Sequence, residues 1–428
     1  MKIVFLTAGA AGMYCGSCMH DNSLARALRG LGVDCLLQPL YTPIRTDEAS
    51  IASKDVFFGG VNIYLLQKFP ALRYLPRPLR RLLDNPRFLS WATKGAGSTD
   101  ASTLGDLAIS MLRGEDGRQR DEVERLVAWL RDEMKPDVII FSNLLIGGCI
   151  PAIRREVPQS KILVILQGDD SFLDHLPATQ RQLAITELSR LSQQCDAIIV
   201  NSQFYGEKMT RTLSLPASKV RVLPLSIDTA AFIDFAPPTD RSPITIGYLA
   251  RISPEKGLHR LIDAFIELAK RPSCEDVRLH VAGWLGKQNE AYLSSLEERL
   301  RVAGLLSRYE YQGSPDLIGK LEMLRRIDLL CVPTEHEEPK GLFVLEAMAA
   351  GVPVVQPYRG AFPELIGSTG GGLLVQPDDP IALADGLQCL VSNPELRLQL
   401  GQAGRRSVLE KHTTSAHAAS LLRLIESL

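Results

Sequence analysis

The sequence predicts an α/β fold built from two doubly wound parallel sheets, one in each half of the chain. Short runs of Val, Ile and Leu alternate with amphipathic stretches almost throughout its 428 residues. Strands that are apolar along their whole length are typical of parallel sheets covered by helices on both faces. A chain of this length also exceeds one ordinary core, so we expect it to divide into domains.

The strand-like runs form two series, and helix-like stretches lie between most of them. The first series is Ile3–Thr7, Cys35–Pro39, Val61–Leu66, Val138–Ser142, Ile162–Gln167, Ala197–Ser202 and Val220–Leu225. The second series is Ile244–Ala250, Val277–Gly283, Tyr309–Gln312, Leu329–Pro333, Val352–Gln356 and Gly372–Val375. The helix-like stretches include Asn22–Arg29, Glu122–Met134, Leu258–Lys270 and Ala291–Val302.

A proline-rich segment separates the two series. Residues 233–243 read IDFAPPTDRSP, which has few strand formers and precedes a fresh strand. We therefore predict an N-terminal domain over residues 1–235, with an insert at about 42–120, and a C-terminal domain over residues 243–410. Residues 411–428 are predicted to add a final helix.

Composition and charge exclude several classes of protein. Hydrophobic content of 45% and charged content of 23% are typical of a soluble globular protein, and a net charge of −1 gives no indication of nucleic-acid binding. The eight cysteines are mostly single and embedded in apolar runs, which predicts reduced, buried thiols and a cytoplasmic location. The start, MKIVFLTAGAAGMYC, could form a short signal peptide with a lipidated cysteine, but its single Lys, its small apolar length and the helix-like continuation argue against that interpretation. No run of 18 apolar residues is present, so no spanning helix is expected.

The most informative segment is Glu338–Gly351, which reads EPKGLFVLEAMAAG. Glu338 lies in a polar loop, and Glu346 lies eight positions later in a short apolar helix. At 3.6 residues per turn, one carboxylate precedes the helix N-terminus and the other lies about two turns inside it. The free N–H groups near Gly341 and Leu342 would hold an anion, and the acidic side chains would hold hydroxyls. A sugar bearing a diphosphate needs this combination of groups.

This segment resembles the E-x7-E element of the family 4 retaining glycosyltransferases (glycosyl transferases group 1). The fit departs at Pro339 and Lys340, where family members mostly have Gly and Phe. The residues that match without a gap are Glu338, Gly341, Leu342, Val344, Leu345, Glu346, Ala347, Met348, Ala349, Gly351, Pro353, Val354 and Val355.

A second segment, Ile246–Gly257 (IGYLARISPEKG), resembles the family's G-R-L-x-x-E-K-G element. Arg251 and Lys256 occupy its two basic positions. In the family these side chains reach the donor diphosphate, and two cations at the carboxyl end of a parallel strand fit that role. Gly283, in HVAGW, resembles a glycine turn that passes near the nucleotide.

The resemblance implies the GT-B architecture, in which two Rossmann-like domains face a central cleft and the C-terminal helix crosses back to the first domain. It implies a hexosyltransferase-type enzyme that moves a sugar, with retention, from a nucleotide-diphosphate donor to a hydroxyl acceptor, either a carbohydrate or a lipid-linked molecule. No metal and no cofactor are expected, because Arg251, Lys256 and the helix N-terminus replace a cation. Glu338 would hold sugar hydroxyls, and Glu346 would bind the ribose.

Lys340 carries a smaller hypothesis. A cation beside the sugar pocket would favour an acidic donor sugar or hold the distal phosphate. The alternative is a lysine that faces solvent at the start of a helix.

The loop Ala8–His20 (AGAAGMYCGSCMH) follows the first strand. Its glycines lack the G-x-G-x-x-G spacing, which argues against a dinucleotide-dependent oxidoreductase. In the resembled family this loop lies over the donor phosphates and the acceptor. Cys15 and Cys18 form a lone C-x-x-C, which we interpret as two small side chains in a tight loop rather than a redox or metal site.

Two later strands of the first domain end in polar residues on the expected crevice side. Asp169 would either orient an acceptor hydroxyl or serve as a helix cap or turn residue. The acceptor-side candidates are Gly12, Cys15, Gly16, Asn143, Gln167 and Asp169.

Residues 68–94 carry seven basic side chains against one acid. One interpretation is a peripheral contact with the inner membrane face that brings the enzyme to a lipid-linked acceptor. The other, which four prolines favour, is an insert beside the cleft with solvated charges. Two rival functions stay open: another GT-B enzyme, such as a sugar-nucleotide epimerase or a phosphorylase, and a non-catalytic nucleotide-sugar-binding subunit.

Overall fold

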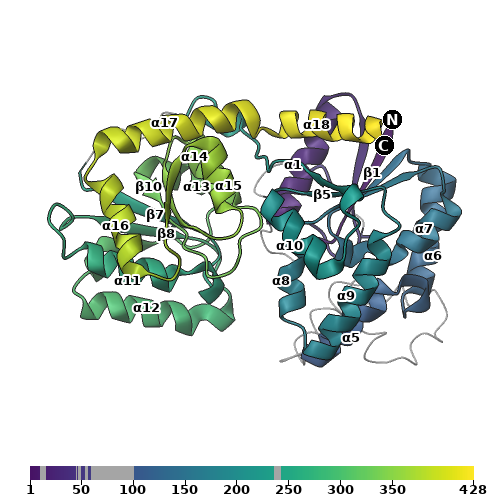
Figure 1. Ribbon diagram of the computed structural model, residues 1–428, viewed down its shortest axis with the longest axis horizontal. Helices are drawn as coiled ribbons and strands as arrows, with labels where there is room; N and C mark the ends of the chain where they lie inside the picture. The colour runs from purple at the N-terminus through teal and green to yellow at the C-terminus, as the bar shows by residue number, and fades with distance from the viewer. Residues whose placement is uncertain (10–15, 45, 47–49, 54–55, 59–100, 236–241) are drawn as a thin grey trace. The chain divides into compact units, whose positions relative to one another are not determined.

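The computed structural model describes residues 1–9, 16–44, 46, 50–53, 56–58, 101–235 and 242–428. The chain divides into two compact units (Figure 1). The first unit comprises Met1–Asn201, Tyr205–Leu223 and Ala418–Leu428, and the second comprises Ser202–Phe204 and Pro224–His417. In the described part of the chain each unit holds one six-stranded parallel sheet. The α/β fold with two parallel-sheet domains is therefore confirmed, whereas the predicted strand at 61–66 lies outside the described residues.

The first sheet has the strand order β2-β1-β3-β4-β5-β6, and its neighbouring strands are parallel. The inner strands β3 and β5 are wholly buried because they are apolar along their length, with the sequences VIIF and AIIV, whereas the edge strand β6 (VRV) is partly exposed. Their bounds are Lys2–Thr7 (β1), Asp34–Pro39 (β2), Val138–Phe141 (β3), Lys161–Ile165 (β4), Ala197–Val200 (β5) and Val220–Val222 (β6).

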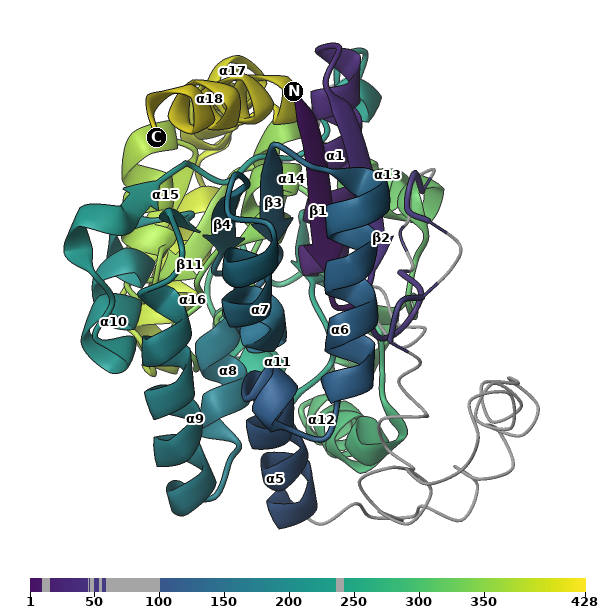
Figure 2. The ribbon, with the colours of Figure 1, turned by 90° about the vertical axis from the view of Figure 1, so that its right-hand side faces the viewer.

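Helices cover both faces of the first sheet. Their bounds are Gly16–Gly30 (α1), Ala101–Leu112 (α5), Arg120–Trp129 (α6), Ile150–Glu156 (α7), Asp169–Asp174 (α8), Ala178–Ser192 (α9), Gln203–Leu213 (α10) and Thr414–Ser427 (α18). Leu24 and Leu28 of α1 share one apolar cluster with Leu421 and Ile425 of α18. Figure 2 shows α6, α7 and α9 along the opposite face. The end of the chain thus belongs to the core of the first unit.

The second sheet has the order β12-β11-β10-β7-β8-β9 and is also parallel. Its first strand, β7, therefore lies at the centre, beside β10. The bounds are Thr245–Leu249 (β7), Arg278–Ala282 (β8), Tyr309–Tyr311 (β9), Leu329–Leu330 (β10), Val354–Pro357 (β11) and Gly372–Val375 (β12).

The helices of the second unit also lie on both faces of its sheet. Figure 1 shows α11 and α12 on one side and α14 and α15 on the other. Their bounds are Leu258–Leu268 (α11), Glu290–Val302 (α12), Leu317–Arg326 (α13), Leu342–Ala349 (α14), Phe362–Thr369 (α15), Pro380–Val391 (α16) and Pro394–Lys411 (α17). The strongly amphipathic α11 places Leu261, Ile262 and Phe265 in the core because they recur on one helical face.

The contacts group residues 224–235 with the second unit, whereas the predicted domains divide after residue 235. Residues 236–241 of the predicted linker lie outside the described residues. Near the chain's return to the first unit, Ile227 pairs with Thr413, and His412 donates from Nδ1 to the carbonyl of Leu225 at 2.8 Å.

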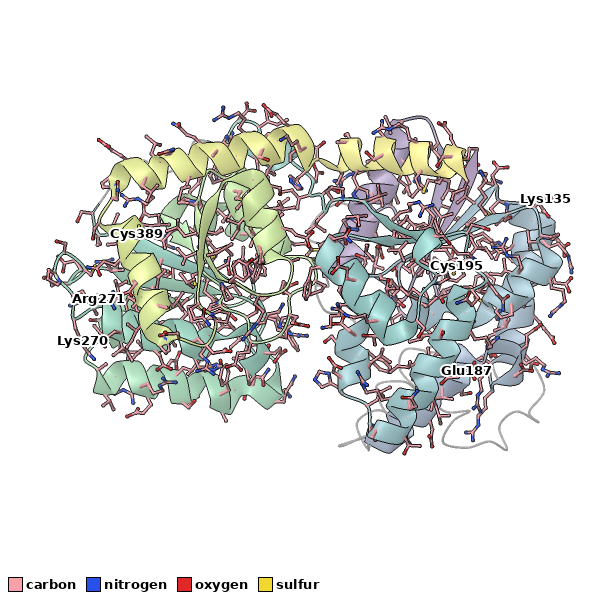
Figure 3. The ribbon with its side chains drawn as sticks, in the orientation of Figure 1. Lys135, Glu187, Cys195, Lys270, Arg271 and Cys389 are labelled. Carbon is pink, nitrogen blue, oxygen red and sulfur yellow. The ribbon has the colours of Figure 1, made fainter. Side chains whose placement is uncertain are left out.

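The described cysteines are free thiols, as the sequence predicts. Six of them are buried, among them Cys195, and Cys389 on α16 is exposed (Figure 3). Among the helices of the described residues, none combines the length and the apolar character needed to span a bilayer.

Candidate functional site

The second sheet brings two loops together at the carboxyl ends of β7 and β10. These strands mark the point where the strand order reverses, which is where doubly wound sheets bind ligands. The turn η7 (Pro254–Lys256) follows β7, and a loop that ends at Gly341 follows β10. Gly257 has a φ of +74°, and a Cβ there would lie 1.9 Å from the carbonyl oxygen of Pro333. Only glycine therefore allows this close approach of the two loops.

The carboxylate of Glu338 lies where these loops meet. Lys256 Nζ donates to Oε2 at 2.6 Å, and His336 Nε2 lies 3.4 Å from the same oxygen. The main-chain N–H groups of Lys340 and Gly341 donate to Oε1, both at 3.3 Å. Glu338 is only 6% exposed, so four donors replace its lost hydration.

Burial raises the pKa of the Glu338 carboxyl, but the charge of Lys256 and the contact with His336 outweigh burial and hold the pKa well below 4.5. Glu338 is therefore an anion. Its oxygens accept hydrogen bonds from the N–H groups at the start of the helix and from Lys256, the groups that the sequence assigns to a donor diphosphate. Lys256 and these N–H groups thus form a site for an anion, and the anion that they hold in this structure is the carboxylate of Glu338.

Arg251 has a different partner from Lys256. Its Nη2 donates to Glu255 Oε1 at 2.8 Å on the same turn, and its side chain is 49% exposed. Burial of Glu255 opposes ionisation, but hydrogen bonding to Ser253 and the charges of Arg251 and Lys256 lower its pKa below 4.5. The structure therefore joins Lys256 to Glu338 and pairs Arg251 with Glu255.

Glu346 lies inside α14, and its side chain turns to a lysine of α13. Lys320 Nζ donates to Glu346 Oε1 at 2.7 Å, and the two side chains are 11% and 16% exposed. Sequence reasoning missed Lys320, because a lysine in the amphipathic stretch LIGKLEMLRR gives no signal of its partner.

The remaining donor-side candidates lie around the same strand ends. Gly341 is the N-cap of α14, Leu342 is its first residue, and Lys340 is buried just before it. The solvent-facing alternative for Lys340 is therefore wrong. Gly283 follows β8 with a φ of +154°, and a Cβ there would lie 1.7 Å from the carbonyl oxygen of Ala250, the residue before Arg251.

Two residues that sequence reasoning missed fix the main chain of these loops. Tyr248 is fully buried in β7, and its hydroxyl lies 3.3 Å from the carbonyl oxygens of both Arg251 and Lys256. Arg359, just after β11, donates through Nη1 to the carbonyls of Thr334 at 3.2 Å and Glu335 at 2.8 Å. The only sequence signal for Arg359 is its place just before Gly360–Glu364 (GAFPE), a segment with the glycine and proline of a turn.

Arg359 also forms an ion pair with Asp378, which follows β12. One guanidinium therefore ties together the segments that follow β10, β11 and β12. Arg359 thus holds the loop that carries Glu338 by donating to main-chain carbonyl groups of that loop.

In the first unit, Gln167 and Asp169 lie at the carboxyl edge of the sheet but serve the main chain. Asp169 is 2% exposed and accepts from the N–H groups of Leu144 at 2.9 Å and Gln167 at 3.0 Å. Burial raises the pKa of Asp169 to about 6. The geometry matches the alternative of a turn residue, and both carboxylate oxygens have main-chain donors.

The other acceptor-side candidates support the same edge or lie elsewhere. Gln167 Nε2 donates to Asp21 Oδ1 at 2.8 Å, and Asn143 accepts from the N–H of Ile146 at 3.2 Å. Gly16 is the first residue of α1. Gly12 and Cys15, like the basic stretch 68–94, lie outside the described residues.

The described residues contain no group of three or more His, Cys, Asp or Glu side chains arranged to hold a metal ion. Positive groups at the candidate site include Lys256, Arg251, Lys340 and the N–H groups at the start of α14.

Comparison with protein families gives two adjoining matches. The model "Glycosyl transferases group 1" matches residues 230–407, and the model "Glycosyltransferase Family 4" matches residues 109–231. The first match contains Lys256, Glu338 and Glu346.

Two curated relatives illustrate the range of similarity. The phosphatidyl-myo-inositol mannosyltransferase of Mycobacterium leprae is 32% identical over 43% of this chain, and the match spans about half of that relative's length, 46%. The human alpha-1,3/1,6-mannosyltransferase ALG2 is 25% identical over 80% of this chain and 82% of its own.

Solved structures share the fold. Sucrose-phosphate synthase from Thermosynechococcus elongatus superposes with a TM-score of 0.70 at 19% identity, over 100% of this chain and 99% of its own. Anabaena Alr3699/HepE in complex with UDP gives 0.70 at 17% identity, over 100% of both chains. With the GT-B fold, the two family matches and these relatives, the chain belongs to the group 1, family 4 glycosyltransferases, a family of enzymes.

Proposed function

We propose that this protein transfers a sugar from a nucleotide-diphosphate donor to a hydroxyl acceptor, with retention at the anomeric carbon. The observation that carries the proposal is the ionised Glu338 bound to Lys256 and to the N–H groups that begin α14. These groups bind one anionic oxygen pair and lie at the switch point of the second sheet. A donor diphosphate would take them over, and Glu338 would then turn to the sugar hydroxyls.

The roles of the other residues follow from their positions. Lys256 and Arg251 would neutralise the diphosphate as the bond to the sugar breaks, so the proposal needs no metal and no cofactor. Glu346 would bind the ribose from inside α14, and Lys320 would orient its carboxylate. The departing phosphate oxygen would accept the acceptor's proton on the same face of the sugar, which gives retention without a separate base.

The named relatives indicate which substrates to test first. HepE was solved with UDP and with UDP-glucose, and two curated relatives are mannosyltransferases, one of them for phosphatidyl-myo-inositol. We therefore propose UDP-sugars and mannosyl donors as donor candidates. A lipid-linked alcohol is the proposed first acceptor class, with cytoplasmic and peripheral membrane placement as part of the same proposal.

A thermal-shift screen against UDP, GDP, ADP and their sugars tests the donor class. A ligand at a hundred times its dissociation constant adds about 2.7 kcal/mol to the free energy of unfolding. Donor hydrolysis without acceptor should then be measured in the wild type and in Glu338→Ala. Hydrolysis that Glu338→Ala abolishes and EDTA leaves unchanged supports the proposal.

Other outcomes identify the rivals. Binding without hydrolysis or transfer to any acceptor indicates a non-catalytic nucleotide-sugar-binding subunit. Conversion of the free sugar nucleotide to its epimer indicates an epimerase, and absorbance from bound pyridoxal phosphate indicates a phosphorylase. Loss of activity with EDTA contradicts the metal-independent part of the proposal.

A further inference from the structure

His336 lies two residues before Glu338, and both of its ring nitrogens face hydrogen-bond acceptors. Nδ1 lies 3.0 Å from the carbonyl oxygen of Glu255, and Nε2 lies 3.4 Å from Glu338 Oε2. A carbonyl oxygen accepts only, so Nδ1 carries a proton. In a neutral ring Nε2 would then present a lone pair to a carboxylate oxygen. The arrangement is favourable only when both nitrogens are protonated and the ring is a cation.

The surroundings hold this ring in place independently of Glu338. The carbonyl of Glu255 accepts from Nδ1 and also from the N–H of Glu335 at 3.0 Å. The hydroxyl of Thr334 donates to the carbonyl of His336 at 3.1 Å. The ring is therefore fixed to the turn after β7 and remains beside the anion site when Glu338 changes its partner.

The charged groups that face the ring come from two segments. Glu338 lies on its own loop, and Lys256 lies on the turn after β7 and donates to the same carboxylate oxygen as His336. Glu335 is next in sequence, but its carboxylate accepts from His259 and from Arg260 at 2.8 Å. His336 and Lys256 thus converge on one anionic oxygen.

We propose that His336, in its doubly protonated form, is a third cation of the donor-diphosphate subsite, beside Lys256 and Arg251, and makes sugar-nucleotide affinity depend on pH. The inference rests on the proposed function and adds a residue to it. A diphosphate diester carries two negative charges. When the diphosphate takes the place of Glu338 beside Lys256, an imidazolium donates a hydrogen bond to one of its charged oxygens, whereas a neutral ring presents a lone pair to that oxygen.

The test measures the dissociation constant of UDP-glucose or GDP-mannose, whichever binds, by calorimetry at several pH values. A sugar nucleotide is used because its diphosphate diester has no ionisation of the kind that terminal phosphates show near pH 6. From about pH 5.5 to about pH 8.5 the affinity of the wild type for the sugar nucleotide should weaken by about tenfold, or about 1.4 kcal/mol.

Two substitutions separate charge from structure. His336→Lys keeps a cation at all these pH values, so its affinity should remain high and independent of pH. The His336→Asn variant has no charge at this position, so its affinity for the sugar nucleotide should be low and should not change with pH. His175→Asn is the matched control. The ring of His175 also contacts a main-chain carbonyl, that of Ser171, but it belongs to the first unit. This variant should keep the wild-type slope.

A flat wild-type profile, or a wild-type slope in His336→Asn, overturns the inference while leaving the proposed function intact. Failure of every sugar nucleotide to bind at any pH contradicts the proposed function itself, and the inference with it. Nitrogen-15 NMR of the wild-type ring gives an independent reading. It should show two N–H protons at low pH, and a ring that is neutral at about pH 5.5 would also overturn the inference.

Discussion

At the scale of single residues, the structure assigns Glu338 a role that its position in the motif alone does not give. Its carboxylate is the proposed ligand of the sugar, and in this structure it accepts from the lysine and the N–H groups that are proposed to bind the diphosphate. Under the proposed function, a donor therefore displaces an internal ion pair when it binds. Loss of the Glu338 charge should therefore strengthen the binding of the nucleotide diphosphate and slow the transfer of the sugar.

Glu338→Gln tests this opposition. Without the carboxylate, Lys256 and the N–H groups of α14 are open to a phosphate, so UDP should bind about tenfold more tightly, a gain of about 1.4 kcal/mol. Transfer should fall by about a hundredfold or more because the sugar loses its ligand. Calorimetry and a turnover assay measure the two effects.

The exposed neighbour Glu337 provides the control, because Glu337→Gln removes the same charge from the same loop. It should change neither quantity by more than about twofold, within the usual range for surface substitutions. If Glu338→Gln weakens UDP binding, the internal anion does not occupy the diphosphate subsite.

The sequence predicted that Lys256 and Glu338 belong to one donor site, because both positions match elements of the resembled family. It did not predict that the two side chains form an ion pair with each other. It could not predict His336, Arg359 or Lys320. These side chains act through main-chain carbonyls or through partners on other elements, and sequence spacing does not encode such contacts. Asp169 shows the converse. Its position in the sequence is compatible with both an acceptor role and a turn role, and only the structure shows that both carboxylate oxygens accept from main-chain N–H groups.

At the scale of elements, the site depends on loops that follow four strands of one sheet. The two-residue strand β10 makes few ladder hydrogen bonds of its own, and its loop is fixed by neighbours instead. Arg359 supplies several of these bonds from the segment after β11. The apolar runs predicted the described strands because most of these strands have an apolar, buried centre, but the runs gave no information on how the loops are joined.

Arg359→Ala should destabilise the second unit by about 1–3 kcal/mol, because it leaves two carbonyls and Asp378 without their charged donor. It should also lower turnover, since the loop of Glu338 loses its support. Chemical denaturation and a turnover assay check both effects.

Arg326→Ala is the matched control. Arg326 also pairs with an acid, Glu310, but the two side chains are 56% and 51% exposed. Such surface pairs contribute about 0–1 kcal/mol, so stability and turnover should both stay near wild type. Equal losses in the two variants would show that Arg359 has no special role.

At the scale of the whole molecule, the last helix links the chain's end to its beginning. α18 packs Leu421 and Ile425 into the core of the first unit, and Lys161 donates to the carbonyl of Ile425 at 2.7 Å. The sequence predicted a helix here, and only the resemblance placed it on the first domain. The spacing of apolar residues in a helix predicts which face of the helix is buried. It does not predict which part of the protein that face packs against.

Leu421→Ala should lower the free energy of unfolding of the first unit by about 2–5 kcal/mol, the usual cost of a cavity in a core. Leu398→Ala, on α17, removes the same atoms from a side chain that is 52% exposed, and should cost about 0.5 kcal/mol or less. Hydrogen exchange resolved to each unit measures both. A Leu421→Ala variant that exchanges like the wild type would show that α18 is not part of that core.

We propose above all that the switch point of the second sheet binds a sugar nucleotide through Lys256. The most direct test is calorimetric titration of UDP-glucose and GDP-mannose into the wild type, Lys256→Ala and Lys270→Ala. Lys270 is an exposed lysine on the same unit, paired with Glu267. Loss of a charge-assisted contact should weaken binding by about tenfold or more in Lys256→Ala alone. Equal affinity in all three proteins would contradict the claim.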